Sequence, residues 1–114
     1  MSDIIYKIMA ADEWAAAESA GVYEGSAHDL HDGFIHFSTA AQAAETAARH
    51  FAGQTGLVLL AIDTALLGDA LKWEPSRGGA LFPHLYGALD ASAVIRIDAL
   101  PIDSNGLHRF PSGF

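Results

Sequence analysis

The sequence predicts a single α+β domain over residues 1–114, with a mixed, mostly antiparallel sheet of about five strands and two main helices. Three observations lead to this prediction. The length of 114 residues is close to the commonest size of one domain. Hydrophobic residues make up 51% and charged residues 18% of the chain, which is typical of a packed globular protein. Short apolar runs of strand character alternate with two alanine-rich segments of helix character.

The first predicted elements are a strand and a helix. The apolar run IIYKIM, residues 4–9, favours a strand that places Tyr6 and Ile8 on one face. The following segment, ADEWAAAESA, has acids in its first turn and Gly21 after its end, which indicates a helix. Residues 21–33 contain three glycines and three acids, and they predict a loop.

A second strand and a second helix follow. The run GFIHFS, residues 33–38, predicts the strand, and TAAQAAETAARHFAG predicts the helix. Thr39 and Gln42 have the spacing of a capping box, although Ser38 is an alternative cap. Gly53 is a natural end for this helix.

The second half of the chain predicts three more strands. The near-continuous apolar run LVLLAID, residues 57–63, is typical of a strand that is buried on both faces. The alternating segments at residues 71–74 and 93–100 predict two further strands, the first of them ended by Pro75. Residues 76–89 predict a long loop that contains glycine.

Composition and charge exclude several classes of function. Six basic and 14 acidic residues give a net charge of −8, which argues against broad binding to nucleic acid or to an anionic membrane. The absence of cysteine excludes disulfides, thiolate zinc ligands and a thiol nucleophile. The sequence has neither a signal peptide nor an 18-residue apolar run, so we expect a cytoplasmic protein. Because the charge argues against nucleic acid and membranes, the expected partner is a small molecule.

His36 is the first candidate site residue, because it interrupts an apolar strand. In a strand, Phe34, His36 and Ser38 share one face, while Ile35 and Phe37 share the other. An unpaired polar group buried there would cost about 1–3 kcal/mol. His36 is therefore either a hydrogen-bonded structural residue or part of a ligand site. Ser38 favours the ligand site, because it lies where the free N–H groups of the next helix begin.

The segment RGGALFPHLYG is the second candidate region. It combines the cation Arg77, the flexible backbone at Gly79, the imidazole of His84 and the phenol of Tyr86, which are the components of a small-molecule site. The alternative is a surface loop anchored by its own apolar side chains. Glu74, shortly before this segment, is either an acid or base or, more simply, a charge on an edge strand.

The segment HDLHD is a weaker candidate. His28 and His31 are three residues apart, with Asp29 and Asp32 beside them, and histidine with carboxylate is a ligand set for divalent metals. However, the segment lies in a glycine-rich region and no third ligand is obvious nearby. We therefore predict no metal site, and a solvated acidic loop is the simpler interpretation.

Four segments in this order, IYKI, DGFIHFSTAAQ, LVLLAID and LFPHLYG, resemble the domain-of-unknown-function 952 family. A strand with the pattern His-apolar-Ser, then a helix, then an apolar strand ending in Asp is more distantly similar to the RNA 2′-phosphotransferases. Those enzymes have an ADP-ribosyltransferase-like fold and bind NAD or ADP-ribose in the cleft of a split mixed sheet. The resemblance implies a split sheet, NAD as a possible cofactor, and a nucleotide cleft that His36 and Ser38 face. In the first strand, where those enzymes carry a histidine followed by Gly-Thr, this chain has Lys7-Ile8-Met9, which permits a different ligand or reaction.

The leading functional prediction is a small enzyme, a transferase of ADP-ribosyltransferase-like type, that acts on a nucleotide-like or phosphorylated molecule. His36 and His84 would act as acid, base or hydroxyl-orienting groups. The predicted ligand-binding residues are Lys7, Ser38, Arg77, Gly79 and Tyr86. Two alternatives remain open: a non-catalytic nucleotide-binding module, and an interaction domain in which His36 is structural.

Overall fold

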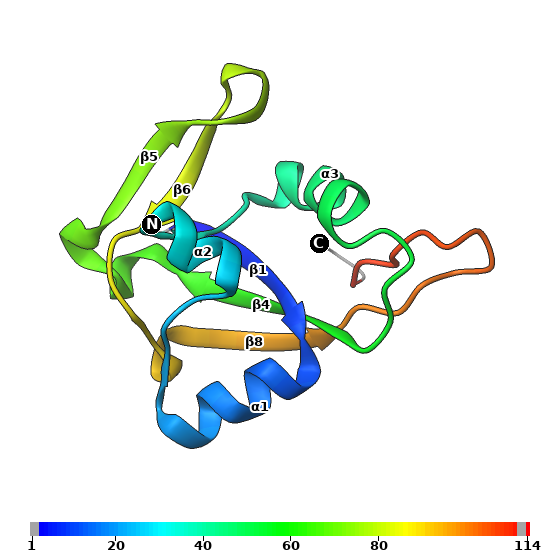
Figure 1. The fold of residues 1–114 in the computed structure, drawn as a ribbon, viewed down its shortest axis with the longest axis horizontal. Helices are drawn as coiled ribbons and strands as arrows, with labels where there is room; N and C mark the ends of the chain where they lie inside the picture. The colour runs from blue at the N-terminus through cyan, green and yellow to red at the C-terminus, as the bar shows by residue number, and fades with distance from the viewer. Residues whose placement is uncertain (1–2, 112–113) are drawn as a thin grey trace.

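A computed structural model describes residues 3–111 and 114 of the chain (Figure 1). The helices are α1 (Ala11–Ala20), α2 (Ala27–Asp32) and α3 (Ala40–His50), and the strands are β1 (Ile4–Ala10), β2 (Val22–Tyr23), β3 (Ile35–His36), β4 (Leu57–Asp63), β5 (Leu71–Pro75), β6 (Leu81–Leu85), β7 (Leu89–Asp90) and β8 (Val94–Ala99). Short 3-10 helices span Thr64–Leu66, Gly68–Ala70, Arg77–Gly79 and Ala91–Ala93. The α+β prediction is confirmed, and all strand pairs among the described residues are antiparallel.

The central sheet has the strand order β1-β4-β8. Strand β4 is the central strand, and apolar clusters cover both of its faces: Leu60 and Ile62 pack in one cluster and Leu59 in the other, and all three are at most 2% exposed. The register with β8 shifts between Ala61 and Ile62. The predicted strand at residues 57–63 and its burial are therefore confirmed.

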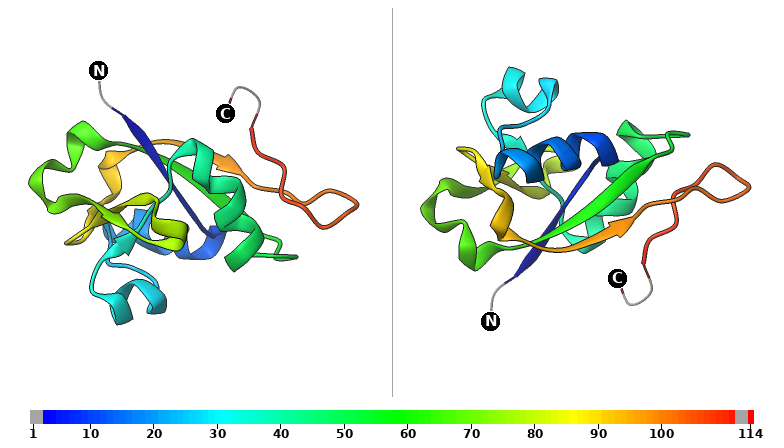
Figure 2. Two further views of the ribbon diagram at one scale, coloured as in Figure 1. Left: turned by 90° about the horizontal axis from the view of Figure 1, so that it is seen from above. Right: turned by 90° about the horizontal axis from the view of Figure 1, so that it is seen from below.

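Helices α1 and α3 cover opposite faces of this sheet, as the views from above and below show (Figure 2). Trp14 of α1 packs in the same apolar cluster as Ile5 of β1, whereas Ala47 of α3 packs in the cluster of Ile8. Side chains alternate along a strand, so Lys7 points to the same face as Ile5, the face that α1 covers. This placement sends the Lys7 ammonium toward the segment between α1 and β3.

A second antiparallel sheet has the order β3-β6-β5, and its β5–β6 hairpin projects from the body of the domain (Figure 1). In this sheet His36 of β3 lies directly opposite His84 of β6. The backbone of Tyr6 in β1 forms an isolated bridge with Ser38, two residues after β3. The two three-stranded sheets are thus joined at that bridge, and β2 and β7 form a separate two-stranded pair.

Two predicted loops are wrong. Residues 21–33 contain β2 and α2, because the capping box of Ser26 and Asp29 satisfies the first N–H groups of α2. Residues 76–89 contain β6 and β7, because the chain reverses at Gly78 and Gly79, whose φ angles are 64° and 81°.

Two predicted boundaries also change. The strand expected over residues 33–38 is reduced to two residues, and α3 ends at His50 with Phe51 as its C-cap, before Gly53. The capping box of Thr39 and Gln42 is confirmed, with Thr39 as the cap. In the described part of the chain, no helix has the length and apolar character needed to cross a membrane.

Candidate functional site

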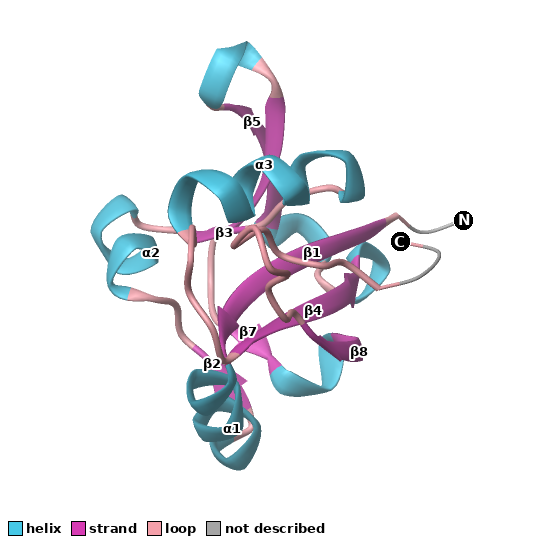
Figure 3. Ribbon diagram, turned by 90° about the vertical axis from the view of Figure 1, so that its right-hand side faces the viewer, coloured by secondary structure: helices cyan, strands magenta, loops and turns pink. Residues whose placement is uncertain are grey.

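Polar side chains from α2, β3 and the β5–β6 hairpin meet at one side of the domain, where α2 stands beside β3 (Figure 3). The centre of this group is the pair of facing residues His36 and His84, whose ring centroids are 5.5 Å apart. We call the group the histidine cluster; its members are Lys7, His28, Asp29, Asp32, Phe34, His36, Glu74, His84 and Tyr86.

Asp29 is the buried anchor of the cluster. Its carboxylate accepts hydrogen bonds from Lys7 Nζ at 3.0 and 3.2 Å, from the Ser26 N–H at 2.9 Å and from the His36 N–H at 3.1 Å. The Nδ1 atom of the His36 ring lies 2.6 Å from Asp29 Oδ1. Since an ionised carboxylate only accepts hydrogen bonds, Nδ1 of His36 carries a proton. Asp29 thereby fixes the orientation of the His36 ring.

The environment keeps Asp29 ionised. Burial alone would raise the pKa of Asp29, but the hydrogen bond from His36, the charge of Lys7 and the backbone N–H groups together hold it well below its usual range. Burial lowers the pKa of Lys7, and the attraction of the Asp29 carboxylate opposes that effect. Burial also raises the pKa of the nearby Tyr23 phenol, with the negative charges of Asp29 and Glu13 adding to the rise. Asp29 is therefore a fixed negative charge at neutral pH.

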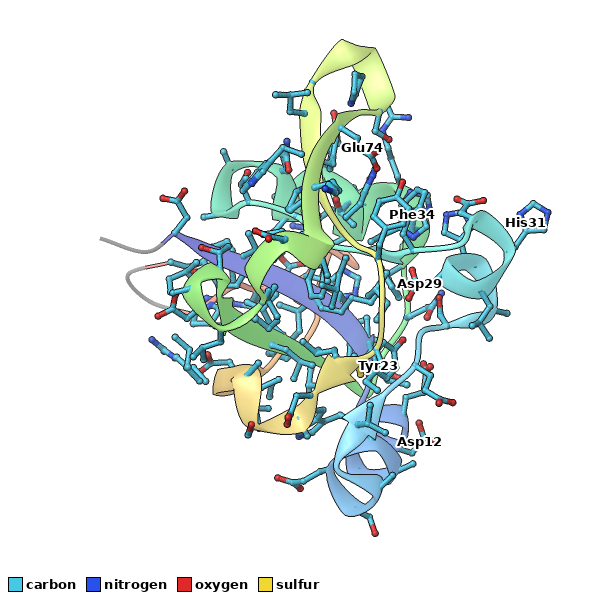
Figure 4. The ribbon with its side chains drawn as sticks, turned by 90° about the vertical axis from the view of Figure 1, so that its left-hand side faces the viewer. Asp12, Tyr23, Asp29, His31, Phe34 and Glu74 are labelled. Carbon is cyan, nitrogen blue, oxygen red and sulfur yellow. The ribbon has the colours of Figure 1, made fainter. Side chains whose placement is uncertain are left out.

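Asp32 contacts the second ring nitrogen of His36, and His28 stacks on the face of the same ring. Asp32 Oδ2 lies 2.9 Å from His36 Nε2 and 3.6 Å from His28 Nε2. The His28 ring stacks on the His36 ring at a centroid distance of 4.5 Å. His31 points away from the domain (Figure 4), with its side chain 86% exposed. His28, Asp32 and His36 offer ligand atoms within 4.8 Å of one another, a spacing that suits a metal ion.

His84 forms the second histidine–carboxylate pair. Its Nδ1 atom lies 2.8 Å from Glu74 Oε1, and the Tyr86 hydroxyl donates to the same oxygen at 2.7 Å. These bonds, from His84 first and Tyr86 second, lower the pKa of Glu74. The Phe34 ring stacks on His84 at a centroid distance of 4.1 Å. Within residues 3–111 and 114, the Nε2 atom of His84 has no hydrogen-bonding partner. The His84 ring is thus held through Nδ1, and Nε2 is the ring nitrogen that could contact a ligand.

The structure brings together four of the residues predicted for the site: Lys7, His36, His84 and Tyr86. The Ser38 hydroxyl is instead bonded to Thr46 of α3 at 2.8 Å.

The other two predicted residues are in the β5–β6 hairpin. Gly79 lies in its turn, where its N–H donates to Ser76 O, and the Arg77 side chain lies outside the described part of the structure.

Sequence reasoning missed the functional importance of Asp29 and underestimated Glu74. The pattern Ser26-x-x-Asp29 is a capping box, and it would have indicated a helix in place of the predicted loop. The helix in turn would have placed His28 and Asp32, four residues apart, on one face. No local signal shows that Lys7 lies opposite Asp29, because the two residues are 22 positions apart.

Comparison with known proteins identifies the family. Residues 8–97 match the family model described as "Protein of unknown function (DUF952)". The chain belongs to the DUF952 family. The match includes all members of the histidine cluster except Lys7, which lies one residue before it. The predicted family is therefore confirmed, while the similarity to ADP-ribosyltransferases remains a prediction.

Solved structures of a similar protein have the same fold. The crystal structure of protein CC0527 from Caulobacter crescentus is 55% identical, covers 93% of each chain and superposes with a TM-score of 0.90. The solution NMR structure of CC0527 is 56% identical over 91% of this chain and 90% of that one, with a TM-score of 0.83. No curated protein matches the DUF952 chain.

Proposed function

We propose that the histidine cluster binds a nucleotide-like or phosphorylated small molecule and catalyses group transfer on it by acid–base chemistry. One observation carries this proposal: two histidines, each oriented by its own carboxylate, face each other across the β3–β6 pair. A carboxylate bonded to one ring nitrogen orients the ring and leaves the other nitrogen to act on a ligand. A single such pair is common in packing, but two pairs whose histidine rings lie 5.5 Å apart support a functional role for this group.

His84 is the proposed proton-transfer residue. Glu74 holds Nδ1, so Nε2 is the atom that accepts a proton from an attacking hydroxyl group. The oxygen of that hydroxyl group bonds to the transferred group, while the bond from the transferred group to its leaving group breaks and the leaving group departs with the electron pair of that bond. His36 orients the ligand, with its ring held by Asp29. Lys7 acts through Asp29, because its ammonium is bonded to that carboxylate.

The surroundings of the two histidines suit a ligand with an aromatic ring and an anionic group. Phe34 and Tyr86 lie beside them, and Tyr86 is 44% exposed, so a base or nicotinamide ring has an aromatic surface on which to stack. We propose Arg77, Gly79 and Ser38 as contacts to the anionic group.

The arrangement of the sheets supports an ADP-ribosyltransferase-like enzyme. Two three-stranded antiparallel sheets joined at the bridge between Tyr6 and Ser38 resemble the split sheet of that fold, and His36 stands next to the junction. NAD is accordingly the first candidate cofactor, and we place the reaction in the cytoplasm.

The test is a ligand screen followed by a turnover assay. NAD, ADP-ribose and mononucleotides are each added to the full chain, and a bound ligand raises the melting temperature. Product formation is then measured for the wild type, for His84→Gln and for His31→Gln as a matched control at an exposed position. We expect His84→Gln to stay folded and to lose about 10²–10⁴-fold in kcat, the contribution typical of a general base.

The outcomes separate the possible functions. Unchanged turnover in His84→Gln contradicts the acid–base role. Binding without turnover in the wild type supports the non-catalytic nucleotide-binding module instead. If no ligand of the panel binds at saturating concentration, the proposed substrate class is wrong.

A further inference from the structure

We propose that His28, Asp32 and His36 form a binding site for a divalent transition metal ion, with His28 Nε2, Asp32 Oδ2 and His36 Nε2 as its ligands. The inference deepens the proposed function, on whose cluster it rests, by naming the cation that would meet an anionic substrate there. Metal binding by these three side chains can nevertheless be measured without any substrate.

The fold gathers the three ligands from a short stretch of sequence. His28 and Asp32 are four residues apart in α2 and share one face of the helix. Gly33, with a φ of 88°, ends α2 and turns the chain into β3, which brings His36 back over the same face. The turn at Gly33 therefore brings together the three side chains of the pattern His-x3-Asp-x3-His.

The distances are close to those that a bound metal ion requires. Asp32 Oδ2 is 2.9 Å from His36 Nε2 and 3.6 Å from His28 Nε2, and the three atoms lie within 4.8 Å of one another. Tetrahedral metal–ligand bonds of about 2.0–2.2 Å place neighbouring ligand atoms roughly 3.3–3.6 Å apart. The His28 side chain, 64% exposed, is free enough to rotate and close the remaining gap.

The contacts of His36 suit a metal ligand. Its Nδ1 atom lies 2.6 Å from Asp29 Oδ1, and its Nε2 atom lies 2.9 Å from Asp32 Oδ2. Histidine ligands of metals commonly donate their other N–H to a carboxylate, and Asp29 supplies that support here.

The excess of negative charge in the histidine cluster also favours a bound cation. Lys7 neutralises Asp29, whereas Asp32 and Glu74 leave two further carboxylates near the point where an anionic substrate is proposed to bind. A divalent ion held by two histidines and one carboxylate would offset this negative charge. Three protein ligands also leave a coordination position open for an oxygen of the substrate. His36 would then be a metal ligand, and His84 would remain as the proton-transfer residue.

Isothermal titration of the tag-free full chain with ZnCl₂ tests the inference. Zn²⁺ alone is the probe, in a buffer without phosphate, and MnCl₂ is titrated in parallel. We expect one ion per chain in the wild type and at least a tenfold weaker affinity in both His28→Ala and Asp32→Asn. His108→Ala is the control, since it removes a histidine that lies outside the cluster and contacts Gln54 O, and we expect its affinity to stay within twofold of the wild type.

Two results of the zinc titration would contradict the metal site. No binding by the wild type at millimolar zinc, or equal losses in His28→Ala and His108→Ala, shows that these residues are not a metal site. Failure of the proposed function is distinguishable: zinc then binds as expected, but no nucleotide binds to the zinc-loaded protein. Conversely, nucleotide turnover that is unaffected by EDTA supports the proposed function and contradicts the role of the metal in it.

Discussion

Replacing Asp29 with asparagine is expected to destabilise the protein strongly. The carboxylate accepts five hydrogen bonds, two from Lys7, two from His36 and one from Ser26, and all five donors are N–H groups. Two of these bonds reach Oδ2 and three reach Oδ1, so the NH₂ group of asparagine faces at least two donors in either orientation. The Lys7 ammonium also loses its counter-charge, although its side chain is only 10% exposed.

The size of the effect follows from this geometry. Removing one partner of a buried ion pair typically costs about 3–5 kcal/mol, because the other charge is left buried. For a domain of this size, that loss lowers the melting temperature by roughly 10–20 °C. The pKa of Asp29 is lowered on folding, so its contribution is present above the unfolded pKa and is complete at pH 7.

Urea denaturation at pH 7 measures the free energy of unfolding of each variant. The set is Asp29→Asn, Lys7→Met, the double variant, and Asp69→Asn as a control at an exposed acid, for which we expect a change below about 0.5 kcal/mol. We expect the double variant to be more stable than the sum of the single losses predicts. The reasoning is refuted if Asp29→Asn stays within about 1 kcal/mol of the wild type or if the two single losses simply add.

Three further predictions test other parts of the structure. Ser26→Ala removes the cap of α2 and is expected to cost about 1 kcal/mol in urea denaturation; no loss would mean that the capping box does not hold the helix. Tyr86→Phe removes a hydrogen bond that lowers the pKa of Glu74, so a ¹³C NMR titration should show that pKa rising toward its usual value, and a fall would contradict the assigned bond. Leu60→Ala at the fully buried centre of β4 should cost about 2–5 kcal/mol by the same denaturation assay, whereas a loss below about 1 kcal/mol is incompatible with the described core.

The elements that the sequence predicts correctly are those whose signals are local. The strand at β1 and the buried strand at β4 have apolar patterns of the right length, and α3 carries the Thr39 capping box at its start. These elements form the central sheet and the helix on one of its faces. Contacts between these elements stabilise the same secondary structure that each segment favours by itself.

The missed elements depend on contacts between distant segments. Helix α2 has six residues, too few for a stable isolated helix, and Asp29 anchors it through Lys7 of β1. Strand β3 is two residues long and is defined only by its pairing with β6. No periodicity identifies an element of that length.

The candidate site was predictable in part for the same reason. His36 and His84 stand out in sequence, because each is a polar residue among apolar ones. Their carboxylate partners do not stand out, since Asp29 and Glu74 occur in segments that resemble a solvated loop and an edge strand. The histidines were therefore predictable, while the groups that orient their rings required the structure.

The most direct test of the histidine cluster as a metal-assisted site is a ¹H–¹⁵N NMR spectrum of the histidine side chains during a zinc titration at neutral pH. We predict that zinc shifts the Nε2 signals of His28 and His36 together and leaves those of His108, which lies outside the cluster, unchanged. In the zinc-bound protein, His36 should show its proton on Nδ1, where Asp29 accepts it. Shifts spread over the exposed histidines, with His36 unaffected, would contradict the central claim.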